Sequence, residues 1–320
     1  MASRFGSHGL VERMRAARVA ADAQMAGFAA EGEAWEETAI TGLVLSTAHP
    51  LARYVKFNQV EEGHTGADWI WWWIDEVTGE AFGAVVQAKR LKRRASRWWI
   101  DFQYNSDQQR RSLEFLGQYF DVVPLYALYL GTRDYRAGAF CRAESHDEDC
   151  ELCAMSTLSV VPTMLTRFGG SAYDETDNAL SFHRSLEELV DPNVDPGDYW
   201  SPDFATATDE FVRFLNEPQA GSRQIARKIV DQIRKARMGM FSAATDAPTT
   251  VRSDAIFPDV PDDRGHFSEP YFRNVLRGLR TAPPKYVQRF LDTGELPEFP
   301  DGQLAGLAVF SIPAPTAAGD

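Results

Sequence analysis

The chain has 320 residues, of which 44% are hydrophobic and 25% are charged, and this composition is typical of a soluble globular protein. No apolar run approaches the roughly 20 residues of a membrane-spanning helix, and residues 1–9 lack the apolar core of a signal peptide. We therefore expect a cytoplasmic protein that does not enter a membrane. The formal net charge of −13 argues against a generally basic nucleic-acid binder, so any positive surface must be local.

Two helices are expected before the first strand. Residues 10–31 are rich in alanine with scattered arginine, which predicts an exposed helix. Residues 34–48 carry apolar side chains at three- and four-residue spacing, the pattern of a helix with one buried face. Glu36 falls near the middle of this stripe and Glu37 at its edge. A carboxylate there requires a partner or a metal ion, although the helix dipole alone also favours acidic residues in a first turn. The stripe consists of Trp35, Ala39, Ile40, Leu43 and Val44.

Three strands are expected next. Residues 53–61 alternate apolar and polar side chains. Residues 69–74 include four tryptophans on both faces of the second strand, which favours a sheet covered on both sides over a platform for stacked bases. Residues 82–86 form a short apolar run typical of a buried strand, and a turn at residues 76–80 joins the last two strands into a hairpin.

Polar residues at the ends of this hairpin are the main candidates for chemistry. Asp68 opens the second strand, and Gln87 and Lys89 end the third. Gln87 and Lys89 share one strand face because strand side chains alternate. A carboxylate and a carbonyl oxygen suit a hard divalent cation, and an ammonium beside them can hold a phosphate or a water nucleophile. This constellation is typical of phosphodiester cleavage; the alternative is a hairpin with a solvated polar end.

The same residues carry a resemblance to a known superfamily. Asp68, preceded by Gly66 and followed after 19 residues by Gln87-x-Lys89, resembles the D…(D/E/Q)-x-K signature of the PD-(D/E)XK restriction-endonuclease-like superfamily. The glutamine version is similar to Mrr-type restriction endonucleases and archaeal Holliday-junction resolvases. The resemblance covers about residues 33–130. It implies an α/β fold with a mixed central sheet flanked by helices, and a site for Mg²⁺ (or Mn²⁺) at Asp68 and Gln87.

The resemblance also implies a helix glutamate in the metal site. Members of the superfamily often supply one from the first core helix, and residues 37–41, Glu-Thr-Ala-Ile-Thr, resemble that helix. This favours Glu37 as the ligand, whereas helical periodicity favours Glu36. Gln87 replaces a commoner acidic residue and brings no negative charge. The helix glutamate therefore matters more, and a two-metal arrangement is less favoured.

A strongly basic segment directly follows Lys89 in an otherwise acidic protein. Its natural partner is the phosphate backbone of DNA, which such a segment binds through ion pairing and counterion release. The alternative is a solvated charged face. Trp98 and Trp99 follow and either pack against the sheet or stack on unpaired bases. The nucleic-acid-binding candidates here are Arg90, Lys92, Arg93, Arg94 and Arg97.

A helix over residues 106–120 and an apolar strand over residues 122–130 complete the predicted core. The resulting order of helix, three strands, helix and strand is that of the restriction-endonuclease-like α/β fold. In related nucleases the helix after the Q-x-K strand faces the substrate. Gln108 is accordingly a secondary candidate for nucleic-acid binding, with an ordinary surface amide as the alternative.

All three cysteines fall in one short stretch, residues 141–153. Cys141, His146, Cys150 and Cys153 supply four ligands with zinc-like spacing, and cytoplasmic proteins seldom form disulfides. A structural Zn²⁺ site is one interpretation. Three reduced, partly buried thiols are the other.

Three regions are expected overall: an N-terminal helix (1–32), a nuclease-like core with the cysteine loop (33–168) and a mainly helical C-terminal region with a disordered tail (169–320). The basic helix at 222–241 either reinforces DNA binding or packs as an ordinary amphipathic helix, and its pattern favours packing. The helices expected in the last region cover residues 209–216, 222–241, 268–281 and 283–294.

The sequence therefore predicts a Mg²⁺-dependent endodeoxyribonuclease, and the resemblance implies a role in restriction or phage defence. Lys89 would orient the attacking water or neutralise charge on the phosphate, while metal bound by Asp68, Gln87 and the helix glutamate would activate that water. Further partners would be a second copy of the chain or a defence-system protein. Two alternatives remain: a catalytically inactive nucleic-acid-binding or sensor module on the same fold, and a partner-binding protein.

Overall fold

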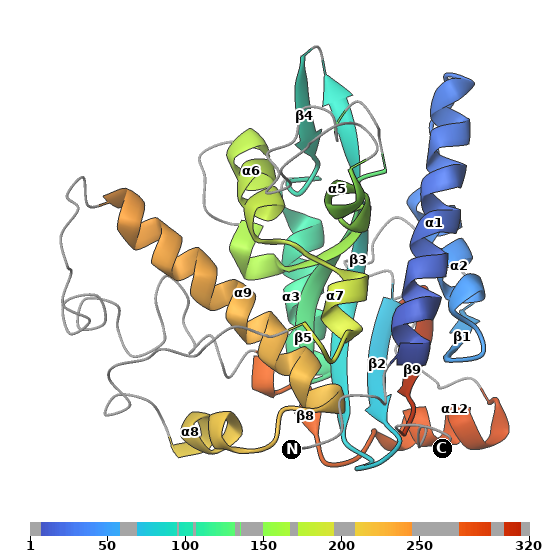
Figure 1. Ribbon diagram of the computed structural model, residues 1–320, viewed down its shortest axis with the longest axis vertical. Coiled ribbons are helices and arrows are strands. Elements are labelled where there is room, and N and C mark those ends of the chain that lie inside the picture. Colours follow the sequence, from blue (N-terminus) through green and yellow to red (C-terminus); the bar gives the residue numbers. More distant parts are fainter. Residues whose placement is uncertain are drawn as a thin grey trace.

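A mixed nine-stranded sheet with helices on both faces forms the centre of the computed structural model (Figure 1). The chain is therefore an α/β protein, as the sequence predicts. The structure describes residues 8–57, 69–94, 96–104, 107–131, 135, 150–166, 172–194, 209–244, 275–295 and 304–314.

The sheet has the order β1-β9-β2-β3-β5-β6-β7, and β4 and β8 also pair with β3. The pairs β2–β9 and β3–β5 are parallel, and the other pairs are antiparallel. The strands are β1 (Ala52–Lys56), β2 (Trp69–Asp75), β3 (Ala81–Arg94), β4 (Arg97–Ile100), β5 (Val123–Tyr129), β6 (Leu158–Pro162), β7 (Arg184–Ser185), β8 (Leu279–Arg280) and β9 (Gly306–Ile312).

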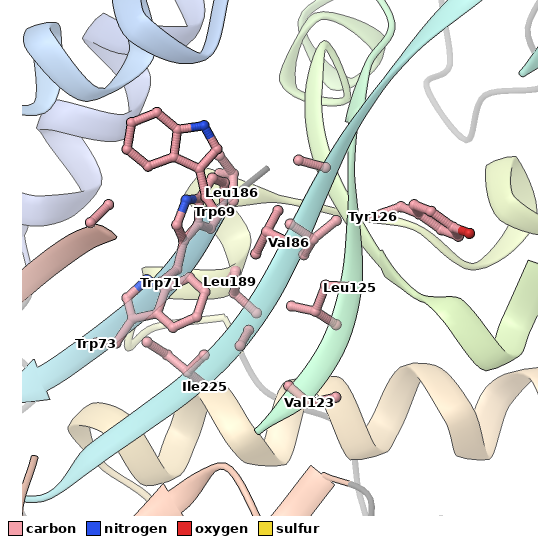
Figure 2. Close-up of a cluster of buried hydrophobic side chains, with 14 of the residues drawn as sticks. Trp69, Trp71, Trp73, Val86, Val123, Leu125, Tyr126, Leu186, Leu189 and Ile225 are labelled. Carbon is pink, nitrogen blue, oxygen red and sulfur yellow. The ribbon is translucent and has the colours of Figure 1, made fainter. Parts of the chain in front are cut away.

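Helices cover both faces of this sheet. The helices are α1 (His8–Ala30), α2 (Glu37–Ala48), α3 (Gln108–Tyr119), α5 (Glu151–Met155), α6 (Ala172–Phe182), α7 (Leu186–Val190), α8 (Asp209–Asn216), α9 (Gly221–Ala244) and α12 (Lys285–Thr293), with one 3₁₀ turn at Thr163–Thr166. Leu189 of α7 and Ile225 of α9 lie beside Trp71 and Trp73 on one face (Figure 2). On the other face, Trp72 Nε1 donates a hydrogen bond to the Tyr286 hydroxyl of α12, at 3.0 Å.

The predicted hairpin of the second and third strands is confirmed. Its register runs from Trp69 opposite Val86 to Ile74 opposite Ala81, and residues 76–80 form the turn. Gly79 in this turn has a φ of 73°, a backbone conformation that glycine adopts without steric cost. The register fixes which side chains share a face of β3, and so where Gln87 and Lys89 point.

The tryptophans of β2 are core residues, so the packing interpretation holds and the base-stacking one is wrong. Trp69, Trp71, Trp72 and Trp73 are all buried. The Trp73 ring stacks on Phe310 of β9 at 5.5 Å between centroids, and Trp71 meets the same ring edge-on at 5.6 Å. Aromatic side chains of this size bury roughly 150–250 Å² each and dominate core energetics.

The N-terminal helix is not exposed as expected. Leucine, methionine and alanine recur along one side of α1 and are buried, although the helix is only weakly hydrophobic overall. Small alanine side chains let α1 pack closely against the rest of the fold. The composition of the helix alone therefore does not reveal that one side is buried. The buried residues are Leu10, Val11, Met14, Ala17, Ala21 and Met25.

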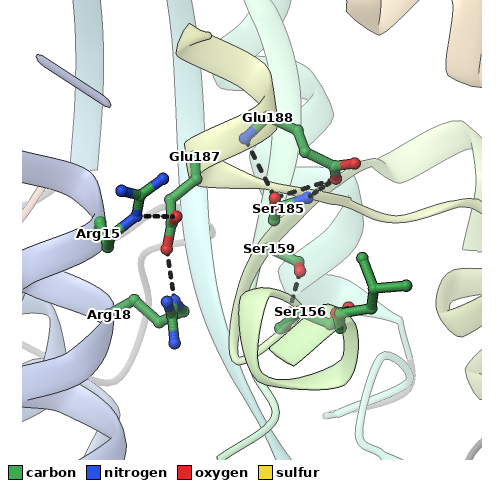
Figure 3. Close-up of polar contacts among 8 residues, drawn as sticks. Arg15, Arg18, Ser156, Ser159, Ser185, Glu187 and Glu188 are labelled. Atoms are coloured by element: carbon green, nitrogen blue, oxygen red, sulfur yellow. Dashed lines mark hydrogen bonds and ion pairs between the residues drawn. The ribbon is translucent and has the colours of Figure 1, made fainter. Parts of the chain in front are cut away.

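Charged side chains also attach α1 to the rest of the fold. Arg18 is buried and pairs with Glu187 of α7, and Arg15 approaches the same carboxylate at 3.3 Å (Figure 3). Helix α7 begins with a capping box, in which Ser185 accepts the N–H of Glu188 and the Glu188 side chain bonds back to Ser185 (Figure 3). The buried pair thus holds two elements that lie far apart in the sequence.

The C-terminal region supplies a strand that the sequence pattern does not predict. Gly306–Ile312 forms β9, which lies between β1 and β2 and is almost entirely buried. The other expectations for this region are partly confirmed: α8, α9 and α12 match three of the predicted helices. Lys228 and Arg227 of α9 are buried, so this helix packs as an amphipathic helix. The prediction of a helix over residues 268–281 is wrong at its end, where Leu279 and Arg280 form β8, and residues 268–274 lie outside the described residues.

Candidate functional site

The candidate site lies where β3 continues past the end of β2. The β2 ladder reaches Val86, opposite Trp69, whereas β5 continues to pair with β3 as far as Arg90, opposite Tyr129. Among the described residues, residues 87–90 of β3 therefore have a strand partner on one side only. Backbone groups at such an edge need other partners, and polar side chains can approach them there.

Glu37 of α2 approaches this open edge. Its Oε1 accepts a hydrogen bond from the backbone N–H of Arg90, at 2.8 Å. Thr41, one turn further along α2, is hydrogen-bonded to the Tyr129 hydroxyl of β5. Helix α2 is thereby fixed over the ends of two central strands, with a carboxylate at the end of β3.

Glu36 does not share this position. Helix α2 begins at Glu37, and Glu36 precedes it in an extended conformation with an exposed side chain. The expectation that Glu36 lies on the buried stripe is therefore wrong, because the helix starts three residues later than predicted. Of the two glutamates, only Glu37 reaches the end of β3.

Gln87 is almost completely buried, with 3% of its surface exposed. Its side-chain Oε1 has no hydrogen-bond partner among the described residues. Most buried polar atoms in proteins are paired, and an unpaired one often marks a function or a missing ion or water. Gln87 thus presents an unsatisfied carbonyl oxygen inside the fold, on the face of β3 that α3 covers.

Lys89 lies on the same face as Gln87 and is also buried, at 7% exposed. Its ammonium donates a hydrogen bond to Oε1 of Gln109 on α3, at 2.9 Å. Gln109 was not predicted as a site residue; the sequence singles out its neighbour Gln108, whose side chain is exposed. Helix α3 starts at Gln108, and its first turn brings position 109 toward the sheet.

Helix α3 also takes part in a buried ion pair. Arg110 of α3 contacts Glu175 of α6 at 3.0 Å. Burial raises the pKa of Tyr126, which lies opposite Gln87 in β5, far above its usual value. The phenol therefore stays neutral.

The basic residues after Lys89 continue β3 and form a hairpin with β4, instead of leaving the sheet. Arg90 donates to the backbone carbonyl of Trp35 and lies over its ring, so this guanidinium holds the start of α2. Lys92 and Arg93 lie over tryptophan rings of β4, and Arg97 is exposed. The side chain of Arg94 is outside the described residues.

Several predicted site residues fall outside the described part of the chain: Asp68 with Gly66, and Cys141 and His146 of the cysteine loop. Cys150 lies just before α5 and Cys153 within it. Among the described residues, no cluster of three or more histidine, cysteine, aspartate or glutamate side chains is placed to hold a metal ion. The zinc site and the magnesium site therefore stay predictions.

Fold and site together define an α/β protein with a polar site at the end of a central strand. Residues 13–312 match a family of unknown function, DUF6615, and the chain belongs to that family. No curated protein and no solved structure matches the chain. Within the part of the chain that the structure describes, every helix is too short or too polar to cross a membrane.

Proposed function

We propose that the protein is a metal-dependent nuclease that hydrolyses phosphodiester bonds in DNA, built on the PD-(D/E)XK plan. The observation that carries the proposal is the buried Oε1 of Gln87, which has no partner in the described part of the chain and lies two residues before a buried lysine on the same strand face. The mixed sheet with flanking helices is compatible with this plan.

The residues present fit a hard divalent cation. Leaving a buried acceptor without a partner costs about 1–3 kcal/mol, and a cation would remove that cost at Gln87 Oε1. Glu37 adds a carboxylate at the end of the same strand, 2.8 Å from the Arg90 N–H. Asp68 directly precedes Trp69, whose partner Val86 is adjacent to Gln87. Oxygen ligands of these three kinds are those that Mg²⁺ prefers.

In the proposed hydrolysis, the metal ion and Lys89 would have different roles. A bound Mg²⁺ or Mn²⁺ supplies Lewis-acid stabilisation and lowers the pKa of a bound water. Lys89, held in place by Gln109, would donate hydrogen bonds to the scissile phosphate and offset the charge that develops on it. Burial strengthens this interaction because water screens it less.

Nicking of supercoiled plasmid DNA with and without Mg²⁺ tests the proposal. We expect Lys89→Ala to lower the nicking rate by at least about 100-fold, the usual effect of removing one donor to a charged transition state. We expect Asp68→Ala to lower it as well, because this variant removes a ligand of the proposed metal ion. Lys285→Ala is the matched control, because Lys285 is an exposed lysine of α12. Circular dichroism should show that all three variants keep the wild-type fold.

Full nicking activity in either site variant would reject these assignments. A wild-type protein that binds the plasmid but leaves it uncut with Mg²⁺ and with Mn²⁺ would instead identify a binding or sensor module on the same fold.

A further inference from the structure

We infer that the β3–β4 hairpin is a ribbon that docks in the major groove of double-stranded DNA. The inference rests on the proposed function, since it assigns a duplex substrate to the same strand that carries Lys89. The hairpin projects from one end of the sheet, away from α8 and α12 (Figure 1). A two-stranded β-ribbon is one of the few elements that fit a major groove about 12 Å wide.

Charge is the first support for this surface. Residues 90–99 contain five basic residues and no acidic one, in a chain whose net charge is −13. Asp101 lies 3.8 Å from the Lys92 ammonium, at the long limit for an ion pair. A local concentration of positive charge on an acidic protein binds phosphates through counterion release.

The hairpin also holds its cations in place before any ligand binds. Lys92 is paired across the hairpin with Trp99, and Arg93 with Trp98. Each cation lies 5.2 Å from the centre of its partner's ring. Such contacts are worth about 0.5–1 kcal/mol at exposed sites and restrict long, flexible side chains. Ordered cations lose less conformational entropy when they bind a phosphate.

The same contacts favour duplex DNA over unpaired bases. Trp98 and Trp99 are only half-exposed, one ring face of each meets a cation, and Trp98 also meets Tyr135 edge-on at 5.8 Å. Binding of single strands relies on open aromatic faces on which bases stack. The rings of this hairpin are already engaged with its own cations, which leaves phosphate contact as its main mode of binding.

Helix α6 braces the base of the hairpin. The backbone N–H of Ile100 donates to Thr176 Oγ1 at 2.8 Å, and the Arg97 guanidinium lies 4.1 Å from the Tyr173 ring centre. The ribbon is thus fixed relative to the sheet.

Lys89 and Arg93 share one face of β3, four residues apart, which corresponds to about 13 Å at roughly 3.3 Å per residue. That distance spans about four base pairs of B-DNA.

Fluorescence anisotropy with a labelled DNA duplex, the matching single strand and a duplex RNA, all in EDTA, tests docking without cleavage. We expect the wild type to prefer the DNA duplex. We expect Arg93→Gln/Arg97→Gln to bind it at least 10-fold more weakly, with the slope of log K against log salt reduced by about 2. Arg93→Lys/Arg97→Lys should keep the wild-type slope.

The matched control is Arg213→Gln/Arg289→Gln, which removes the same charge from exposed arginines of α8 and α12. Equal loss of binding in both double variants, or tighter binding of the single strand or the RNA, would overturn the inference. If the Arg93→Gln/Arg97→Gln variant cleaves DNA as well as the wild type does, the inference is overturned and the proposed nuclease stays intact. A wild type that binds duplex through these arginines but never cleaves supports the inference and rejects the nuclease.

Discussion

Gln87 places an unsatisfied polar atom in the core, which is expected to lower stability. Its Oε1 is buried without a hydrogen-bond partner among the described residues, whereas its neighbours on β3, Val85 and Val86, are fully apolar. Replacing the amide by an apolar group of similar size removes the desolvation cost of the oxygen. Residues kept at such a position are expected to serve function at the expense of stability.

We therefore predict that Gln87→Leu raises the free energy of unfolding by about 1–2 kcal/mol in EDTA. The same variant should lose the increase in melting temperature that Mg²⁺ gives the wild type, because a ligand stabilises only a fold that binds it. Thermal unfolding of both proteins in EDTA and in Mg²⁺ measures the two effects. An equal Mg²⁺ effect on both proteins would show that no cation contacts Gln87.

The site residues differ in how far the sequence defines them. Strand alternation alone places Gln87 and Lys89 on one face, and the structure agrees. It does not choose Glu37 over Glu36 or Gln109 over Gln108, since each choice depends on where a helix starts and how that helix packs on the sheet. An error of two or three residues at a helix start changes which side chain faces the sheet.

At the scale of elements, the attachment of α1 depends on a buried charge pair. Arg18 and Glu187 are both almost completely buried, and they join α1 to α7. Removing one partner of such a pair leaves an uncompensated charge in the interior, whereas replacing both with apolar groups is often neutral. The Arg18–Glu187 pair is therefore expected to fix where α1 packs on α7 more than to add net stability.

Our prediction is that Glu187→Ala lowers the free energy of unfolding by about 3–5 kcal/mol. The double variant Arg18→Met/Glu187→Leu should recover most of this loss, because no buried charge is left alone. Urea unfolding of the wild type, Arg18→Met, Glu187→Leu and the double variant completes the thermodynamic cycle. Simple addition of the two single effects would mean that the pair is not coupled.

Helices and strands with strong local sequence patterns are predictable from the sequence. Strands that form because they pair with strands distant in the sequence are not. The β2–β3 hairpin, β5 and α8 follow from periodicity and turn residues. The length of β3 was missed because a run of basic residues is untypical of a strand; here β4 pairs with it and tryptophan rings cover its cations. β9 was missed because a short apolar segment gives no sign of its pairing partners.

At the scale of the whole molecule, β9 joins the two ends of the chain. It lies between β1 and β2, and its Phe310 contacts both Trp71 and Trp73. The central sheet therefore requires residues from both ends of the described chain. Local sequence patterns predict its strands up to β5 but give no sign of β9.

Phe310→Ala should lower the free energy of unfolding by about 3–5 kcal/mol, as expected when a buried aromatic ring is removed from a packed core. Phe115→Ala is the matched control, because Phe115 lies on the outer side of α3 with 56% of its surface exposed, and its removal should change stability by less than about 0.5 kcal/mol. Chemical denaturation followed by tryptophan fluorescence compares them. A similar small effect for both variants would show that β9 contributes little to the core.

The position of β9 also has a consequence for synthesis of the protein. During translation β2 leaves the ribosome long before β9, so its tryptophans lack their final neighbour while the intervening residues are made. Until β9 is made, the edge of β2 that pairs with it is open. The nuclease site proposed next to Trp69 would be completed only once β9 has been made and has paired with β2.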